Sequence, residues 1–191
     1  GFQGDTSSLV VTSLGLQTGL VGRIQEGVER VATEGLVTVR SGTYSGDVDT
    51  TGKAVTLNAG DGPSQVYVDG NFALDSDDTL LVQLNGTLPG NQYDQWIVSG
   101  DVSLGDAELD VLRSFTPVPM DSFTIIDNLS DNAVTGQFSG LDDGDTLLVD
   151  GVPLEIDYQA GADNDVALYY DTTPILNADE LSTIVDNLIE V

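Results

Sequence analysis

Carboxylate groups are the side chains of this sequence most able to carry out chemistry. Its 191 residues include 32 Asp and Glu residues against five Lys and Arg residues, and the formal net charge is −27. Glycoside hydrolysis uses a pair of carboxylates, one of them kept protonated by burial. Two groups of acids lie close together in the sequence: Asp75, Asp77 and Asp78, and Asp142, Asp143 and Asp145. Both lie among residues typical of turns, so we expect exposed, ordinary acids and no catalysis.

Other reaction classes lack the residues that they need. Abstracting a proton beside a uronate carboxylate requires cations that neutralise the developing charge. The sequence contains only five cationic side chains that could do this, which makes such a lyase reaction less expected: Arg23, Arg30, Arg40, Lys53 and Arg113. The sequence has no His and no Cys, which excludes thiol chemistry, disulfides and the usual zinc sites. The acidic balance argues against binding to nucleic acids or anionic lipids, and no stretch approaches the roughly 18 apolar residues of a membrane span.

Calcium is the ligand that suits these acids best, because it prefers carboxylate and carbonyl oxygens. Residues 161–166, GADNDV, resemble one repeat of the calcium-binding nonapeptide type. The resemblance implies Asp163, Asn164 and Asp165 as calcium ligands. Such sites need a stacked neighbouring repeat to complete the coordination, so a solvated turn is the alternative.

Aromatic residues and one lysine raise two further possibilities. Trp96, Tyr67, Tyr169 and Tyr170 have flat faces that suit the CH groups of sugars, but the strand context favours a core position for Trp96. Lys53 follows Thr51 and Gly52 directly. This context favours a solvent-facing lysine over an intramolecular isopeptide bond, which requires a lysine buried beside an acid.

A single amphipathic helix is expected near the N-terminus, over residues 23–34. Ile24, Val28 and Val31 are spaced so that they share one helical face, and charged residues face away from them. Gly35 is a suitable residue to end this helix. Residues 1–22 form a lead segment, with one short strand expected at residues 9–11.

From residue 36 to residue 170 the pattern is that of short β-strands separated by turns. Alternation is clear at residues 80–84, where Leu80, Val82 and Leu84 share a face. With no helix between strands, the chain is all-β, and two architectures remain: an antiparallel β-sandwich or a right-handed parallel β-solenoid. The preceding helix favours the solenoid, because it can act as a lid on the first turn. We expect about seven turns of roughly 20 residues.

The last part of the chain is expected to differ from the parallel turns before it. The dipeptides at 85–86 and 150–151, Asn-Gly and Asp-Gly, are hairpin signals, so the end of the solenoid region 23–170 is expected to pair antiparallel. Residues 171–191 are expected to form a linker and a helix over 177–190. Its apolar stripe must be buried against the sheet or against a partner: Leu181, Ile184, Val185 and Leu188.

Two stretches resemble known families. The helix motif at 24–31, IQEGVERV, precedes LVTV at 36–39, SGTY at 41–44 and KAVTL at 53–57. This order is similar to the opening of right-handed parallel β-helix proteins of the pectin-lyase-like superfamily, with Gly27 and Val28 where Ala and Ile are usual. A second set resembles modules of large bacterial cell-surface and autotransporter-passenger-like proteins: LNGT at 84–87, YDQ at 93–95, VSG at 98–100, FTIIDN at 123–128, GQFSGL at 136–141 and GADNDV at 161–166.

These observations lead to one expected function and two alternatives. The resemblances imply a non-catalytic structural or adhesive module of an extracellular bacterial surface protein that is able to self-assemble. Its expected partners are other copies of itself or cell-surface glycans. The alternatives are a calcium-dependent glycan-binding module and a glycan-active β-helix hydrolase that uses the Asp groups.

Overall fold

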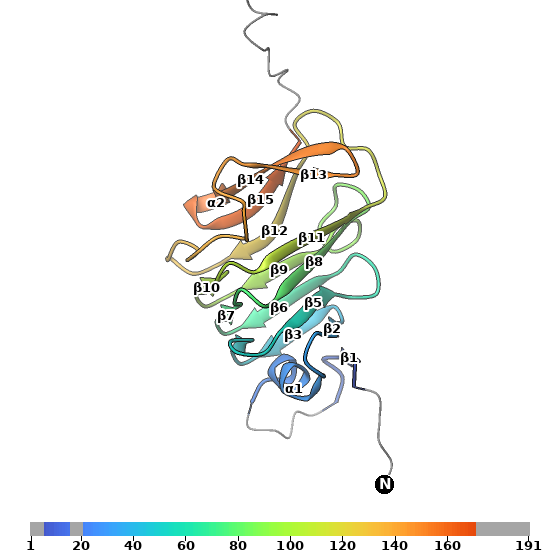
Figure 1. The fold of residues 1–191 in the computed structure, drawn as a ribbon, viewed down its shortest axis with the longest axis vertical. Coiled ribbons are helices and arrows are strands. Elements are labelled where there is room, and N and C mark those ends of the chain that lie inside the picture. Colours follow the sequence, from blue (N-terminus) through green and yellow to red (C-terminus); the bar gives the residue numbers. More distant parts are fainter. Residues whose placement is uncertain (1–5, 16–20, 171–191) are drawn as a thin grey trace, which may run out of the picture.

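The protein is a parallel β-solenoid of about four turns, seen in a computed structural model that describes residues 6–15 and 21–170 (Figure 1). The expected solenoid is confirmed, and the antiparallel sandwich is wrong as the overall architecture. Each turn supplies strands to sheets that run along the length of the molecule. No helix within the described ranges is long and apolar enough to cross a membrane.

Three sheets make up the solenoid. Sheet A is entirely parallel and contains β1 (Ser8–Val11), β2 (Gly35–Val39), β5 (Val55–Ala59), β8 (Thr79–Leu84) and β11 (Glu108–Arg113). Sheet B begins with the parallel strands β3 (Gly42–Ser45), β6 (Gln65–Asp69), β9 (Gln95–Val98) and β12 (Ser122–Asn128). Sheet C is short and parallel, with β4 (Val48–Asp49), β7 (Phe72–Ala73) and β10 (Val102–Ser103).

The core consists of side chains stacked from turn to turn. In sheet B, Val66 pairs with Trp96 and Trp96 with Ile126, and all three are 0% exposed. In sheet C, Phe72 lies in register between two valines, and its ring is 5.1 Å from that of Trp96. Stacking of this kind buries a continuous apolar column, although one turn alone buries little.

From β2 onward the turns become longer along the chain, which corrects the expectation of about seven uniform turns. Leu36 pairs with Thr56, a spacing of twenty residues. Bonds that join later turns span 30 residues, as from Gln65 to Gln95. Part of the extra length lies in the β8–β9 loop, which turns back on itself with a bond from the Asn85 N–H to the Gln92 carbonyl of 2.6 Å.

The helix α1 (Arg23–Arg30) covers the first turn, as expected. Ile24, Val28 and Val31 are 1%, 2% and 3% exposed, so the predicted apolar stripe faces the core. Figure 1 shows the helix lying across the lower end of the solenoid. Gly27 permits this approach, because a Cβ there would lie 2.7 Å from the Cγ2 of Val11.

The helix ends earlier than predicted, at Arg30. Val31 has extended backbone angles, and the expected stop, Gly35, is instead the first residue of β2. The Lys53 ammonium group donates to the Val28 carbonyl at 2.6 Å and to the Glu29 carbonyl at 2.9 Å. A cation at this position stabilises the carbonyl end of a helix. Lys53 is therefore a helix-capping residue, not the solvent-facing lysine that was expected.

Two short segments complete the N-terminal end. The strand expected at residues 9–11 is present as β1, which pairs with β2 in parallel. The Gln25 side chain covers the edge of β4: its amide donates to the Asp49 carbonyl at 3.0 Å and accepts from the Asp49 N–H at 2.8 Å. The side chain thus takes the place of a further strand in sheet C.

The last strands of sheet B run antiparallel. β12 pairs with β15 (Asp165–Tyr169), β15 with β14 (Val152–Gln159) and β14 with β13 (Thr146–Val149). Asp150 and Gly151 form the β13–β14 turn with φ values of 48° and 77°, as a type I′ hairpin requires. A short helical segment, α2 (Ala160–Asp163), connects β14 to β15. The helix expected over 177–190 lies outside the described residues.

Candidate functional site

One carboxylate of the first Asp group is buried. Asp78 is 1% exposed, and its Oδ1 accepts from the Val55 N–H at 3.1 Å. Its Oδ2 accepts from the Asp75 N–H at 2.8 Å and from the Thr50 hydroxyl. Burial raises the pKa of Asp78, although these hydrogen bonds oppose the shift. The expectation of an exposed, ordinary acid is therefore wrong for Asp78, which joins two turns.

Three of the remaining acids, Asp75, Asp143 and Asp145, also bind the backbone of turns. Asp75 accepts from the Gly52 N–H of the preceding turn at 2.6 Å. Asp143 accepts from the Tyr158 N–H at 2.9 Å, and Asp145 accepts from the Asp142 N–H at 2.8 Å. Asp142, Asp143 and Asp145 are exposed, as predicted. Neither group shows the pair of acids in a groove beside aromatic residues that a glycosidase would need.

Asp94 is a buried acid that the sequence did not single out. It is 0% exposed and lies just before β9. One carboxylate oxygen accepts from the Ser64 N–H at 2.7 Å, and the other accepts from the Gln83 N–H at 2.8 Å. Burial raises the pKa of Asp94 to about 7, against the effect of these two bonds. The motif Tyr93-Asp94-Gln95 gave no signal of burial, because a single Asp before a strand is also typical of an exposed turn.

A ladder of polar side chains follows the corner between sheets B and C. The Asn71 N–H donates to Asp47 at 2.7 Å, and the Asp101 N–H donates to the Asn71 side chain at 2.8 Å. The Asn132 amide then donates to Asp101 at 2.8 Å. Each bond joins one turn to the next, so this corner is fastened along several turns.

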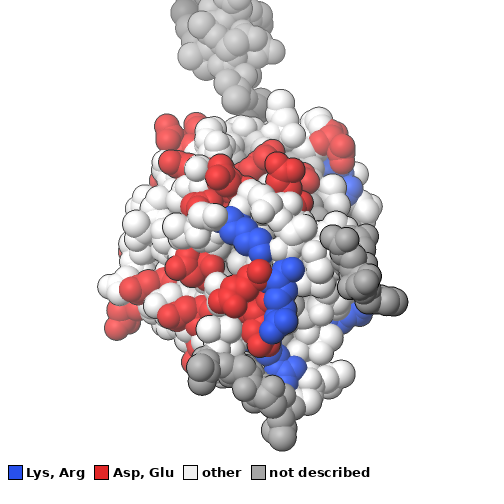
Figure 2. All heavy atoms as spheres, turned by 60° about the horizontal axis from the view of Figure 1, so that its bottom comes forward, with Lys and Arg blue, Asp and Glu red and all other residues white. Residues whose placement is uncertain are grey.

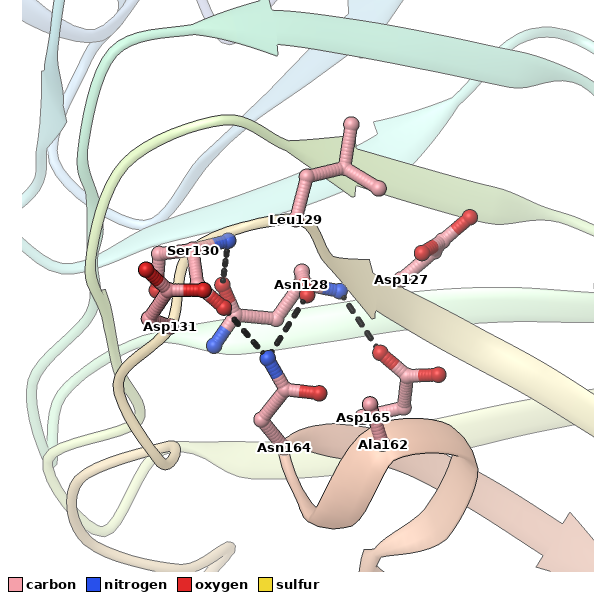
Figure 3. Close-up of a pocket in the computed structure, with 8 residues that line it drawn as sticks. All are labelled: Asp127, Asn128, Leu129, Ser130, Asp131, Ala162, Asn164 and Asp165. Atoms are coloured by element: carbon pink, nitrogen blue, oxygen red, sulfur yellow. Dashed lines mark hydrogen bonds between the residues drawn. The ribbon is translucent and has the colours of Figure 1, made fainter.

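Two of the three predicted metal ligands, Asn164 and Asp165, line a hollow of about 360 Å³ between the end of β12 and the α2–β15 turn (Figure 3). The Asn164 amide donates to the Asn128 carbonyl at 3.0 Å and to the Ser130 carbonyl at 2.5 Å. Asp165 accepts from the Asn128 N–H at 2.9 Å. Asn164 and Asp165 therefore attach β15 to β12, while Asp163 is exposed.

A pair of carboxylates gives this hollow its electrostatic character. Figure 3 shows Asp127 and Asp165 on the same side of the hollow, from neighbouring strands. Burial is the main cause of the raised pKa of both groups, and the Asp127 charge raises the pKa of Asp165 further. Asp127 was not among the predicted residues, because its partner lies 38 positions away. The lining contains no Lys, Arg or aromatic residue.

The oxygen atoms around the hollow are of the kind that binds calcium, but they are not grouped as a calcium site requires. Carboxylate and carbonyl oxygens are the ligands that calcium prefers. In the described part of the chain, however, no three or more His, Cys, Asp or Glu side chains are grouped so that they could hold a metal ion. A calcium ion at Asp163, Asn164 and Asp165 would depend on main-chain and water oxygens as well.

Three of the four aromatic candidates fall into two groups, and the fourth, Tyr67, is half-buried in β6. Trp96 is 0% exposed in the core, as predicted, and its indole nitrogen has no hydrogen-bond partner. Tyr169 and Tyr170 are half-buried and line a second hollow of about 360 Å³ with Met120 and Glu155. This hollow offers flat apolar faces beside a carboxylate.

Comparisons with known proteins assign no family to this chain. No protein-family model, no curated protein and no solved structure matches the chain.

Proposed function

We propose that this chain is a non-catalytic structural or adhesive module of an extracellular bacterial surface protein. The observation that carries the proposal is the use of the acids. Asp78 and Asp94 are bound by backbone N–H groups of adjoining turns, and Asp47 and Asp101 belong to the corner ladder. These carboxylates are occupied in fastening the solenoid, which favours a rigid element over a reactive site.

The charge supports an extracellular setting. A surface with a formal charge of −27 stays hydrated, and its self-repulsion is screened where salt is abundant. The resemblance to pectin-lyase-like and autotransporter-passenger-like segments agrees with this setting. The test is protease shaving of intact cells that produce the protein. Release of peptides from residues 21–170 supports the proposal, whereas protection until the cells are lysed contradicts it.

A second candidate is a glycan-binding module that depends on calcium. The hollow of Tyr169, Tyr170 and Glu155 favours it, because aromatic faces and a carboxylate are common parts of sugar sites. Melting the protein with calcium and then with chelator tests the metal, since a ligand of the native state must raise the melting temperature. Binding to glycans that is lost in Tyr169→Ala and kept in Tyr67→Ala would support this candidate.

A glycan-active hydrolase is the remaining alternative. It would use the paired carboxylates Asp127 and Asp165, which have raised pKa values. Release of reducing sugars from glycans by the protein, and its loss in Asp165→Asn, would support hydrolysis.

A further inference from the structure

The hollow beside Tyr169 is mostly apolar and lies on the outer face of sheet B. Its volume is about 360 Å³, and it is lined by two tyrosines, one methionine and one carboxylate: Met120, Glu155, Tyr169 and Tyr170. Glu155 pairs with Tyr169 across the β14–β15 ladder, so both side chains are on the same face of the sheet. This face is the outer one, because the neighbouring residue Leu168 is 0% exposed in the core.

Met120 is held at this hollow in an unusual backbone conformation. Its φ is 77°, in the left-handed region that a bulky side chain rarely adopts. Two hydrogen bonds fasten its turn: the Val118 N–H donates to the Asp121 carboxylate at 2.7 Å, and the Met120 N–H donates to the Tyr170 carbonyl at 3.3 Å. The Met120 side chain is nevertheless 93% exposed. A strained residue that holds a thioether in water beside two tyrosines points to contact with a ligand.

The Tyr169 ring is neutral and lies in a negative field. Burial is the main cause of the raised pKa of Tyr169, and the charges of Asp157 and Asp165 raise this pKa further. Asp165 precedes Tyr169 by four residues in β15, so the two side chains share the outer face. The phenol therefore stays protonated at neutral pH, and its π-face can attract a cation.

Basic side chains are concentrated far from this hollow. Residues 114–170 contain no Lys or Arg. Four of the five basic residues lie in α1 or between β2 and β5: Arg23, Arg30, Arg40 and Lys53. Figure 2 turns this N-terminal end forward and shows basic side chains on it, with acids among them. The fifth, Arg113, belongs to sheet A and donates to the carbonyl groups of Phe115 and Val149. A ligand in the hollow therefore meets a negative potential that no neighbouring cation offsets.

We propose that the hollow of Met120, Glu155, Tyr169 and Tyr170 binds a small quaternary ammonium ion. Such an ion has an apolar surface and a positive charge, which suits both the lining and the field of this hollow. Its methyl groups would contact the tyrosine and thioether surfaces, and Glu155 would face its charge. It has no N–H group, so it does not need the hydrogen-bond acceptors that a primary ammonium group would lose on leaving water.

The same field selects among ligands that carry a trimethylammonium group. Betaines and phosphocholine head groups carry an anion as well, which the acids around the hollow repel. A neutral sugar gains nothing from the negative potential. Choline, which has a single positive charge and a hydroxyl group, is therefore the probe of choice. The inference goes beyond the proposed structural function, because it gives this end of the module a ligand.

An NMR titration of the isotope-labelled full chain tests the ligand class. Choline chloride is added while the Met120 methyl and Tyr169 amide signals are followed, with sodium chloride at equal ionic strength as the reference. We expect a saturable shift with a dissociation constant on the order of 1 mM. The neutral isostere, in which carbon replaces the nitrogen of choline, is expected to bind about tenfold more weakly, because it lacks the cation–π attraction. Equal binding of the isostere, or no saturable shift with choline, would overturn the proposal.

Substitutions test whether the hollow is the site. Tyr169→Leu keeps an apolar side chain but removes the ring, and Tyr67→Leu is the matched control at a half-buried tyrosine of β6. We expect about tenfold weaker choline binding in Tyr169→Leu and unchanged binding in Tyr67→Leu. Glu155→Gln, at an exposed position, keeps the test open if Tyr169→Leu fails to fold, and it is expected to weaken binding about threefold. Parent-like binding in Tyr169→Leu or Glu155→Gln, or equal losses in both tyrosine variants, would contradict the assignment.

Other occupants of the hollow give different results in the same experiment. Stronger shifts of the Met120 methyl signal with neutral oligosaccharides would assign the hollow to glycans, and stronger shifts with phosphatidylcholine vesicles would assign it to a lipid surface. Nuclear Overhauser contacts from this methyl group to residues 171–191 would show that the chain covers its own hollow. Each of these results contradicts the proposal. Cell-surface shaving tests the proposed function separately, because choline binding does not depend on where the chain is located.

Discussion

Replacing Asp94 by Asn is expected to remove a specific part of the pH dependence of stability. Asp94 is 0% exposed, and its ordinary pKa of 3.8 is raised to about 7 by burial. The folded state therefore holds a proton that the unfolded state has already released between these two values. The stabilisation from protonated Asp94 is complete below about pH 4, decreases as the pH rises, and is lost above about pH 7.

The size of the effect follows from the shift. The pKa of Asp94 rises by about three, from 3.8 to about 7. Each tenfold change in proton affinity corresponds to about 1.4 kcal/mol of free energy of unfolding. The total is about 4 kcal/mol, of which about 3 kcal/mol falls between pH 4.5 and pH 8. Asn also has one acceptor oxygen for two N–H donors, those of Ser64 and Gln83. This mismatch costs about 1–3 kcal/mol at every pH.

The assay is urea unfolding of the parent protein and Asp94→Asn at several pH values from 4.5 to 8. The stability advantage of the parent protein is expected to shrink by about 3 kcal/mol over this range. Asp110→Asn, at an exposed site, removes the same charge and controls for general repulsion. A difference between the parent and Asp94→Asn that stays constant with pH, or that changes equally in Asp110→Asn, would refute the reasoning.

Three further substitutions test how the turns are fastened, each by urea unfolding. Asp78→Ala leaves buried donors without an acceptor and is expected to cost about 3 kcal/mol, whereas a loss below about 1 kcal/mol would show that the bonds matter little. Gly70→Ala places a Cβ 2.6 Å from the Gly46 backbone and is expected to cost about 2 kcal/mol, while Gly62→Ala meets nothing within 4 Å and is expected to be nearly neutral; equal costs would contradict this. Lys53→Met removes the cap of α1 and is expected to cost about 1 kcal/mol, with no change if the cap has no role.

The sequence predicted the parts of the fold that depend on apolar spacing. Ile24, Val28 and Val31 form the lid because a helical repeat brings them to one face. Leu80, Val82 and Leu84 are all 0% exposed, as their alternation in one strand required. These patterns are local, so a single stretch of sequence is sufficient to read them.

The candidate site was predictable to a much smaller extent. Whether a carboxylate at a turn faces solvent or the next turn depends on residues of that next turn. Asp78 and Asp94 were indistinguishable in sequence from the exposed acids around them, yet each accepts a hydrogen bond from a backbone N–H group more than 20 residues away. The hollow beside Asp127 likewise depends on β15, which returns antiparallel from a distant part of the chain.

The loop between β8 and β9 shows how this architecture tolerates added sequence. Its bonds are mostly internal, as between Asn85 and Gln92, and Leu88 near its tip is 56% exposed. Doubling the length of a flexible loop costs only about 0.6 kcal/mol in closure entropy. Peptides inserted at this tip would be presented on a rigid support, and the turns on either side would keep their strand register.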